Sequence, residues 1–449
     1  FIGVFDTMEE CIEAAKIAQK KLVNEYSLAD RDRFLNSIKK LYADNAEEMA
    51  QLEFDETGFG RYADKLDKNI STVSTLAGTE ALKHDVMASN DGLTVEYYAP
   101  WGVVGAVTPS TNPSITVFGN GVCGMIAGNS MVFNGHPSAK VGTAWSVDIF
   151  NRAVVAVGGP ENLLCTVKEP TMDTLDTMMM SPDVKLLVGT GGPGMVATLM
   201  RSGKRVLAAG AGNPPVVIDE TADIKKAAEE LYADISYENN IQCTSEKELF
   251  VVKDVFDEFM DTFEKAGAVR LNKEQGEKVT DICLTKTDDG EYTGAKKCVG
   301  KNAGVILEMA GIPVEGDPGV AFFETSNDHP LVYTEQLMPI IPVIKCENFE
   351  EAMNRAVAAE GGRHHSAAIW SNHIEDVTAF GKAIDTTIYV QNGWTSAAFG
   401  LGGTGINTAT IATPTGDGLT NPQTFTRKRY FVMAVSYTHL RAHETDSYL

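Results

Sequence analysis

The feature that most constrains the fold is a repeated alternation of short apolar runs with helical segments. Six β-rich or aliphatic runs are predicted to be strands: residues 101–108, 129–133, 185–188, 216–218, 248–252 and 340–344. Helices are predicted between some of them, at residues 139–152, 195–201 and 224–235. Alternating strands and helices predict an α/β fold, a parallel sheet with helices on both faces.

The two ends of the chain carry further signals. Thr7 with Glu10 three residues later is a capping-box pattern, which predicts the start of a helix. A second helix is predicted over residues 35–52. Residues 92–97 alternate between apolar and polar positions and predict a strand, and residues 425–432 are predicted to form the last strand.

Residues 436–449 have no usable period and no relation to the segment before them. We interpret them as a non-native appendage, of the kind that a translated sequencing-adapter read leaves at the end of a gene model. His439 and His443 have a spacing that could hold a metal on a helix, but no metal site is predicted. The chain begins at Phe1 and not Met, so the true start is expected to be missing.

Composition excludes several classes of protein. The 449 residues allow two or three domains at roughly 150 residues each. The net charge is −23, so the chain lacks the basic surface that nucleic acid or an anionic membrane requires, and neither partner is expected. Apolar runs are too short for a membrane-spanning helix. Seven cysteines, an odd number without a CxxC motif, indicate reduced thiols and a cytoplasmic location.

Two polar segments are candidates for chemistry. Asn112 lies in the turn TPSTNP directly after a predicted strand, where a side-chain amide is a good donor to a developing oxyanion. The alternative is a turn residue that bonds its own backbone. Cys243 lies in NNIQC, on the turn before the strand at residues 248–252, where a thiol can be an exposed nucleophile. The alternative is a small core residue.

Two glycine-rich segments are candidates for ligand binding. The loop VGTGGPG at residues 188–194 lies between a strand and a helix, where backbone amides can approach a pyrophosphate. It does not match GxGxxG, so an ordinary turn is the alternative. The segment AGAGNPP at residues 209–215 is by itself only a turn.

Together these segments resemble the aldehyde dehydrogenase family, specifically the CoA-acylating members of propanediol, ethanolamine and clostridial butyraldehyde metabolism. The stretches that carry the resemblance are GVFDTMEECIEAAKIAQ, DETGFGR, PWGVVGAVTPSTNP, MVFNGHPSAK, LLVGTGGPGMV, AGAGNPPVVIDETADI, NNIQCTSEKELFVV, EQLMPIIPVI and GLGGTGINTATIATPTGDGLTNPQTFTRKR. They cover residues 3–432, nearly the whole chain. The resemblance implies two doubly wound α/β domains plus a β-flap oligomerisation element.

The resemblance also implies roles for individual residues. Cys243 corresponds to the nucleophile that forms a thiohemiacetal with the aldehyde and then a thioester. Asn112 and the Cys243 backbone N–H correspond to the oxyanion hole. The implied cofactor-binding residues are Thr108 and Pro109; His136, Pro137 and Ser138 on the adenosine side; Thr190, Gly191 and Gly194 near the pyrophosphate; Gly210; and Glu335 on the nicotinamide ribose. Gly135 departs from the usual Asn-Pro-His-Pro pattern of the family.

The subfamily is indicated by a missing residue. Hydrolytic aldehyde dehydrogenases carry a glutamate that activates water, and the corresponding position here is Ala209, with no carboxylate between Arg201 and Ile218. The resemblance therefore implies reversible NAD-dependent oxidation of a short-chain aldehyde, such as acetaldehyde, propionaldehyde or butyraldehyde, with CoA as the co-substrate that releases acyl-CoA. His364 and His365 are expected to be loop or core residues.

Domain boundaries and assembly follow from the same resemblance. Residues 1–87 and 101–212 are expected to bind NAD and CoA, residues 213–415 to form the catalytic domain, and residues 88–100 with 416–434 to form the flap. A homodimer or homotetramer is expected. A bacterial microcompartment is a further expected location, if the missing start targets the shell.

Three other functions are alternatives. A hydrolytic aldehyde dehydrogenase that releases a carboxylic acid is opposed by Ala209. A nicotinamide-independent cysteine acyltransferase or thioesterase is opposed by the glycine-rich loop and Glu335. A catalytically silent scaffold is opposed by the presence of both Cys243 and Asn112.

Overall fold

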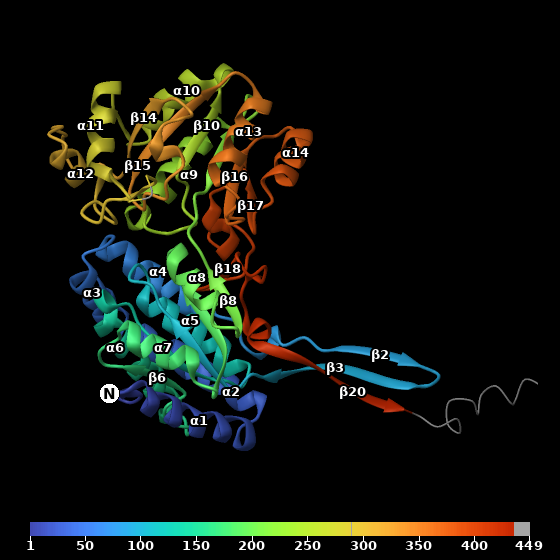
Figure 1. Ribbon diagram of the computed structural model, residues 1–449. Coiled ribbons are helices and arrows are strands. Elements are labelled where there is room, and N and C mark those ends of the chain that lie inside the picture. Colours follow the sequence, from blue (N-terminus) through green and yellow to red (C-terminus); the bar gives the residue numbers. More distant parts are fainter. Residues whose placement is uncertain (289, 435–449) are drawn as a thin grey trace, which may run out of the picture.

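The computed structural model describes residues 1–288 and 290–434, so the tail with His439 and His443 lies outside the described residues. Two α/β lobes are stacked on each other, and a long arm leaves the first lobe (Figure 1). The predicted α/β class is confirmed, since both lobes are built on parallel sheets. No helix in the described ranges has both the length and the apolar character needed to cross a membrane.

The first lobe contains a six-stranded parallel sheet in the order β1-β6-β5-β4-β7-β8. Its strands are β1 Val4–Phe5, β4 Val103–Val107, β5 Ser130–Asn134, β6 Leu164–Val167, β7 Val184–Thr190 and β8 Arg205–Ala209. Its helices are α1 Met8–Glu25, α2 Leu28–Asp44, α3 Ala46–Thr57, α4 Tyr62–Ser74, α5 Pro113–Ile126, α6 Lys140–Ala156, α7 Met172–Met180 and α8 Pro193–Met200.

Alternation along β4 explains why helices cover both faces of this sheet. Val104 and Ala106 pack into the core that contains α2, α5 and α6. Val103 and Val107 point the other way, into the core that contains α1, α7 and α8. Because β4 lies between β5 and β7, the chain changes direction across the sheet at the end of β4. Ligands of open α/β sheets bind at such a switch point.

The second lobe contains a seven-stranded parallel sheet in the order β11-β14-β15-β10-β9-β16-β17. Its strands are β9 Pro215–Ile218, β10 Glu248–Val252, β11 Val269–Arg270, β14 Ala321–Thr325, β15 Ile340–Cys346, β16 Ser366–Trp370 and β17 Ile388–Gln391. Its helices are α9 Ile224–Ser236, α10 Lys253–Lys265, α11 Lys273–Cys283, α12 Ala303–Met309, α13 Phe349–Glu360 and α14 Ile374–Ile384.

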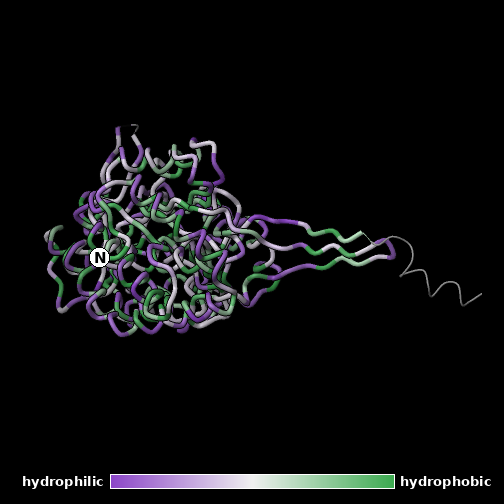
Figure 2. Tube along the Cα trace, turned by 90° about the horizontal axis from the view of Figure 1, so that it is seen from below, coloured by the Kyte–Doolittle hydropathy of each residue, from purple (hydrophilic) through white to green (hydrophobic). Residues whose placement is uncertain are grey.

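The arm is a three-stranded antiparallel sheet in the order β2-β3-β20. The strands are β2 Asp85–Ser89, β3 Gly92–Pro100 and β20 Thr426–Ala434, so β2 begins three residues before the expected flap boundary at 88. Figure 2 shows the strands running side by side away from the body, with hydrophobic residues along them. Two small hairpins, β12 Leu284–Lys286 with β13 Tyr292–Gly294 and β18 Ile411–Ala412 with β19 Gly418–Leu419, complete the strands.

One predicted helix is wrong. Residues 35–52 do not form a single helix, because α2 ends before Asn45 and α3 begins after it. Asn45 leaves the helical region (φ −120°, ψ 12°), and its side-chain Nδ2 donates to the Leu41 carbonyl at 2.7 Å. Asparagine competes in this way with the helical backbone, so it ends one helix and starts the next. The capping box of Thr7 and Glu10 is confirmed at the start of α1.

Candidate active site

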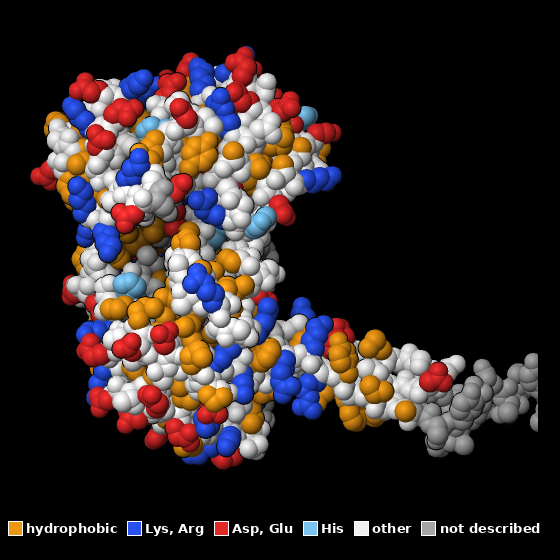
Figure 3. Space-filling model, in the orientation of Figure 1, with side chains coloured by type: hydrophobic (Ala, Val, Ile, Leu, Met, Phe, Trp, Pro, Cys, Tyr) orange, Lys and Arg blue, Asp and Glu red, His pale blue; other side chains and the backbone are white. Residues whose placement is uncertain are grey.

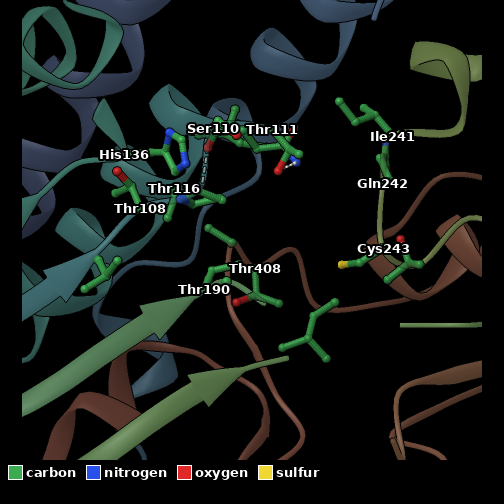
Figure 4. Close-up of a pocket in the computed structure, with 18 of the residues that line it drawn as sticks. Thr108, Ser110, Thr111, Thr116, His136, Thr190, Ile241, Gln242, Cys243 and Thr408 are labelled. Carbon is green, nitrogen blue, oxygen red and sulfur yellow. Dashed lines mark hydrogen bonds between the residues drawn. The ribbon is translucent and has the colours of Figure 1, made fainter. Parts of the chain in front are cut away.

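Residues from both lobes line one cavity of about 610 Å³. The first lobe contributes the carboxyl ends of β4 and β7, and the second lobe contributes the loop before β10 and the segment before β15. The molecular surface is hollowed between the lobes (Figure 3). Figure 4 shows the Cys243 sulfur directed into this space, on the side opposite to Thr108 and His136.

The backbone before Cys243 is held in an unusual conformation. Glu238, Asn239 and Asn240 follow one another with φ of 52°, 55° and 57°, the left-handed region. Asparagine adopts this conformation more readily than most residues. The turn, η3 Tyr237–Asn240, therefore ends α9 abruptly and places Cys243 at the cavity wall, half-buried.

Side chains on both sides fix this loop. Asn239 Nδ2 donates to the carbonyls of Gly60 and Gly300 at 3.2 and 3.0 Å. The buried Lys247 Nζ donates to the carbonyls of Asn240 and Gln242, each at 2.9 Å. The loop bearing Cys243 is thus anchored to both lobes.

The environment of Cys243 favours the neutral thiol. Burial raises the pKa of Cys243 to about 12, and the Glu335 carboxylate raises it further, whereas Lys247 opposes the rise. Burial in turn lowers the pKa of Lys247 to about 8. A thiol in these surroundings becomes a nucleophile only when it loses its proton.

Asn112 lies across the cavity at the N-terminus of α5, where Pro113 occupies the first helical position. Its Oδ1 accepts a hydrogen bond from Lys68 Nζ at 2.6 Å. Its Nδ2 makes only a 3.5 Å contact with Thr111 Oγ1 among the described residues. The amide N–H groups are therefore available to a ligand oxygen.

The structure brings most of the predicted cofactor residues to this cavity. Those that line it are Thr108, Pro109, His136, Pro137, Thr190, Gly191, Gly210 and Glu335. Ser138 and Gly194 do not line it: Ser138 is exposed and contacts His136 Nδ1 through Oγ at 2.8 Å, and Gly194 is exposed in the first turn of α8.

Two observations fit a bound nucleotide. Thr190 Oγ1 is buried and has no hydrogen-bond partner within the described ranges, so a polar ligand would satisfy it. A Cβ placed on Gly192 or Gly194 would meet no heavy atom within 4 Å, so the surface there is open enough for a ligand to approach the backbone. Both features lie where β7 leads into α8.

Carboxylates are scarce around Cys243. Ala209 is buried at the end of β8 and does not line the cavity. Glu335 is the one carboxylate that lines it in the described part of the chain, and its Oε1 accepts a hydrogen bond from the Gly212 N–H at 2.9 Å. Nowhere in residues 1–288 and 290–434 do three or more His, Cys, Asp or Glu side chains form a metal-binding group.

Four residues of the site could not be recognised from the sequence. Lys68 and Glu238 are buried charges whose partners come from other elements. Lys247 is a buried charge whose partners are carbonyls five and seven residues before it. His365, expected to be a loop or core residue, is fully buried directly before β16, and its ring lies 3.0 Å from the position that a Cβ on Gly212 would take. The Nδ1 atom of His365 contacts Ser366 Oγ at 3.0 Å, and its Nε2 atom has no partner among the described residues. Burial lowers the pKa of His365 to about 4.

Comparison with known proteins agrees with this geometry. The aldehyde dehydrogenase family model matches residues 5–412. The acetylating acetaldehyde dehydrogenase EutE of Salmonella typhimurium is 43% identical over 438 residues, covering 97% of this chain and 93% of the relative.

Two solved structures are similar over nearly the whole chain. A propionaldehyde dehydrogenase from the Clostridium phytofermentans fucose-utilisation bacterial microcompartment is 40% identical with a TM-score of 0.94, covering 98% of this chain and 100% of that chain. A Rhodopseudomonas palustris propionaldehyde dehydrogenase with bound CoA and an acylated cysteine is 39% identical with a TM-score of 0.93, covering 96% of this chain and 98% of that chain.

Proposed function

Because the chain belongs to the aldehyde dehydrogenase family, we propose that it catalyses reversible oxidation of a short-chain aldehyde with NAD and CoA to acyl-CoA, NADH and a proton. The observation that carries the proposal is the arrangement of one cavity. It places the Cys243 thiol and the Asn112 amide on walls that come from different lobes, with Glu335 as the one carboxylate that lines it among the described residues.

Cys243 begins the reaction. Its Sγ attacks the aldehyde carbon, the thiol proton is released to solvent, and the carbonyl electron pair moves to the oxygen. Asn112 Nδ2–H and the backbone N–H of Cys243 stabilise the resulting oxyanion by hydrogen bonding. The anchored loop keeps Sγ in position for this attack, so little reorganisation is needed at the moment of reaction.

We assign the nucleotide to the cavity between the two lobes. Thr190 and Gly191 would hold its phosphates, His136 and Pro137 its adenosine side, and Glu335 its nicotinamide ribose. Bound there, NAD would supply the acceptor for the hydride that leaves the carbon attached to Cys243. Cys243 then carries the acyl group as a thioester.

The scarcity of carboxylates determines which nucleophile releases the acyl group. Water is a poor nucleophile toward a thioester unless a base removes its proton, and Ala209 supplies none. Glu335 is engaged by the Gly212 N–H. A thiol attacks a thioester more readily than water does, so CoA takes the acyl group and regenerates the Cys243 thiol.

The test is NADH formation from propionaldehyde and NAD, measured with and without CoA, with the product identified by mass. Dependence on CoA and formation of propionyl-CoA would support the proposal. Steady NADH formation without CoA, with propionate as product, would show that water attacks the thioester. It would also show that a base elsewhere in the site serves the hydrolytic reaction, because Ala209 has no group that accepts a proton.

The same proposal assigns roles to the parts of the chain. We assign nucleotide binding to residues 1–87 and 101–212, catalysis to residues 213–415, and assembly into a homodimer or homotetramer to residues 88–100 and 416–434. The exposed apolar residues of the arm support the assembly role. The Clostridium relative comes from a bacterial microcompartment, and on that ground we propose the same association for this chain.

A further inference from the structure

A buried charge cluster lies directly behind Asn112. Lys68, on α4, donates from Nζ to Asn112 Oδ1 at 2.6 Å and forms a short hydrogen bond to Glu238 Oε2. Lys65, one turn earlier on the same helix, donates to the same Glu238 oxygen at 3.0 Å. The side chains of Lys65, Lys68 and Glu238 are 1%, 8% and 0% exposed, so water screens these charges poorly.

In its hydrogen bonds the cluster pairs two amines with one carboxylate, and the buried Glu53 carboxylate also acts on Lys68 from further away. Two ammonium groups face one carboxylate, whose other oxygen, Oε1, already accepts a hydrogen bond from the Arg61 backbone N–H at 3.0 Å. Glu238 therefore cannot neutralise both lysines. The Asn112 carbonyl oxygen accepts one of the remaining Lys68 hydrogen bonds.

This contact determines how the Asn112 amide is oriented. A lysine ammonium has three donors and no acceptor, so the atom it contacts must be the amide oxygen and not the nitrogen. Nδ2 is thereby left free of the Lys68 contact and able to donate. A cation on the oxygen also polarises the amide and strengthens its N–H donors.

We propose that Lys68 is a positioning residue for the oxyanion hole, which holds the Asn112 amide in the donating orientation and strengthens its hydrogen bond to the substrate oxygen. This inference rests on the proposed role of Asn112. Lys68 contacts Asn112 and lines the cavity. Within the described residues, Lys65 contacts Glu238 but not Asn112, and it does not line the cavity. The two lysines therefore form a matched pair for a test.

The test compares Lys68→Met, Lys65→Met, Asn112→Ala and the double variant Lys68→Met/Asn112→Ala. Two rates are measured for each: kcat for CoA-dependent NADH formation, and alkylation of Cys243 by iodoacetamide. Alkylation forms the S–C bond and expels iodide without creating an oxyanion, so it reports on the thiol and its loop alone. Lys68→Gln, which keeps a neutral donor, replaces Lys68→Met if that variant does not fold.

The expected pattern separates positioning from a structural role. Asn112→Ala lowers kcat by about 100- to 1,000-fold, as loss of an oxyanion donor does. Lys68→Met lowers kcat by about 10- to 100-fold, the range for a hydrogen bond to a charged group. Both variants alkylate at the wild-type rate, and the double variant is no slower than Asn112→Ala. Lys65→Met changes kcat far less than Lys68→Met.

Four results would overturn the inference. Multiplicative effects of Lys68→Met and Asn112→Ala would show that the two residues act independently. An equal loss of alkylation in Lys68→Met would show that Lys68 acts on the Cys243 loop through Glu238. Unchanged kcat in Lys68→Met with an impaired Asn112→Ala would remove the inference but leave the proposed function standing. Full activity of Asn112→Ala would overturn the proposed role of Asn112 and the inference with it.

Discussion

At the scale of single residues, the site combines the half-buried Cys243 thiol with the buried Lys247 amine. Lys247 contacts the loop carbonyls on either side of Ile241, and its charge lowers the pKa of Cys243 against the larger effect of burial. A nucleophile with a pKa of about 12 is almost wholly protonated at neutral pH.

The pH dependence of Cys243 alkylation follows from these values. Because only the thiolate reacts, the rate with iodoacetamide in the absence of NAD rises about tenfold per pH unit from pH 7 to 8. Above the Lys247 pKa of about 8, loss of the ammonium charge raises the Cys243 pKa further, so the increase becomes less steep. Peptide mass mapping measures the rate, and Cys243→Ala, which should also lose turnover, is the control. A rate that is already independent of pH at pH 7 would contradict the prediction.

At the scale of elements, the glycine-containing segment before β9 meets the Cys243 loop. The segment before β9 passes so close to the Cys243 loop that a Cβ on Gly212 would lie 2.2 Å from the Cys243 carbonyl oxygen. The Gly212 N–H meanwhile binds Glu335. One backbone position therefore sets the spacing between the nucleophile loop and the candidate ribose-binding residue.

Gly212→Ala should displace the Cys243 loop. We expect kcat to fall by about 100-fold, the cost of an ångström-scale misplacement of a reacting group. The control is Gly142→Ala on α6, where the nearest heavy atom lies 3.4 Å from the new Cβ, an ordinary contact. Wild-type kcat in Gly212→Ala, with thermal melting showing both variants folded, would mean that the loop has room to adjust.

Some elements and site residues could be predicted from the sequence and others could not. The strands β9 and β10 lie within one residue of their predicted ranges, because each apolar run is bounded by turn residues. Cys243 and Asn112 could be proposed because both follow turn signals beside predicted strands. Lys68 could not, since it lies 44 residues before Asn112 on a separate helix and only tertiary packing joins them. The sequence pattern does not indicate the helix break at Asn45, because the apolar spacing typical of a helix continues across that residue.

At the scale of the whole molecule, the arm is the part that one chain cannot stabilise well. Its three strands project from the first lobe, and apolar side chains on them remain in solvent: Val86, Met87, Tyr430, Phe431 and Val432 are 55–63% exposed. An isolated three-stranded sheet with apolar groups exposed gains little from burial. A second copy of the chain that covers these residues would bury them, which supports the proposed assembly.

The double substitution Phe431→Asp/Val432→Asp should therefore dissociate the assembly. Adjacent residues on a strand point to opposite faces, so the pair places a charge on each face of the arm, and burying either charge against a partner is strongly unfavourable. Light scattering coupled to size-exclusion chromatography should give the mass of two or four chains for the wild type and of one chain for the variant. Ile374→Asp is the control, since Ile374 is equally exposed, at 63%, but lies at the start of α14, far along the chain from the arm. A wild-type protein that elutes as one chain would exclude the proposed assembly, and an undiminished mass in the double variant would place the interface elsewhere.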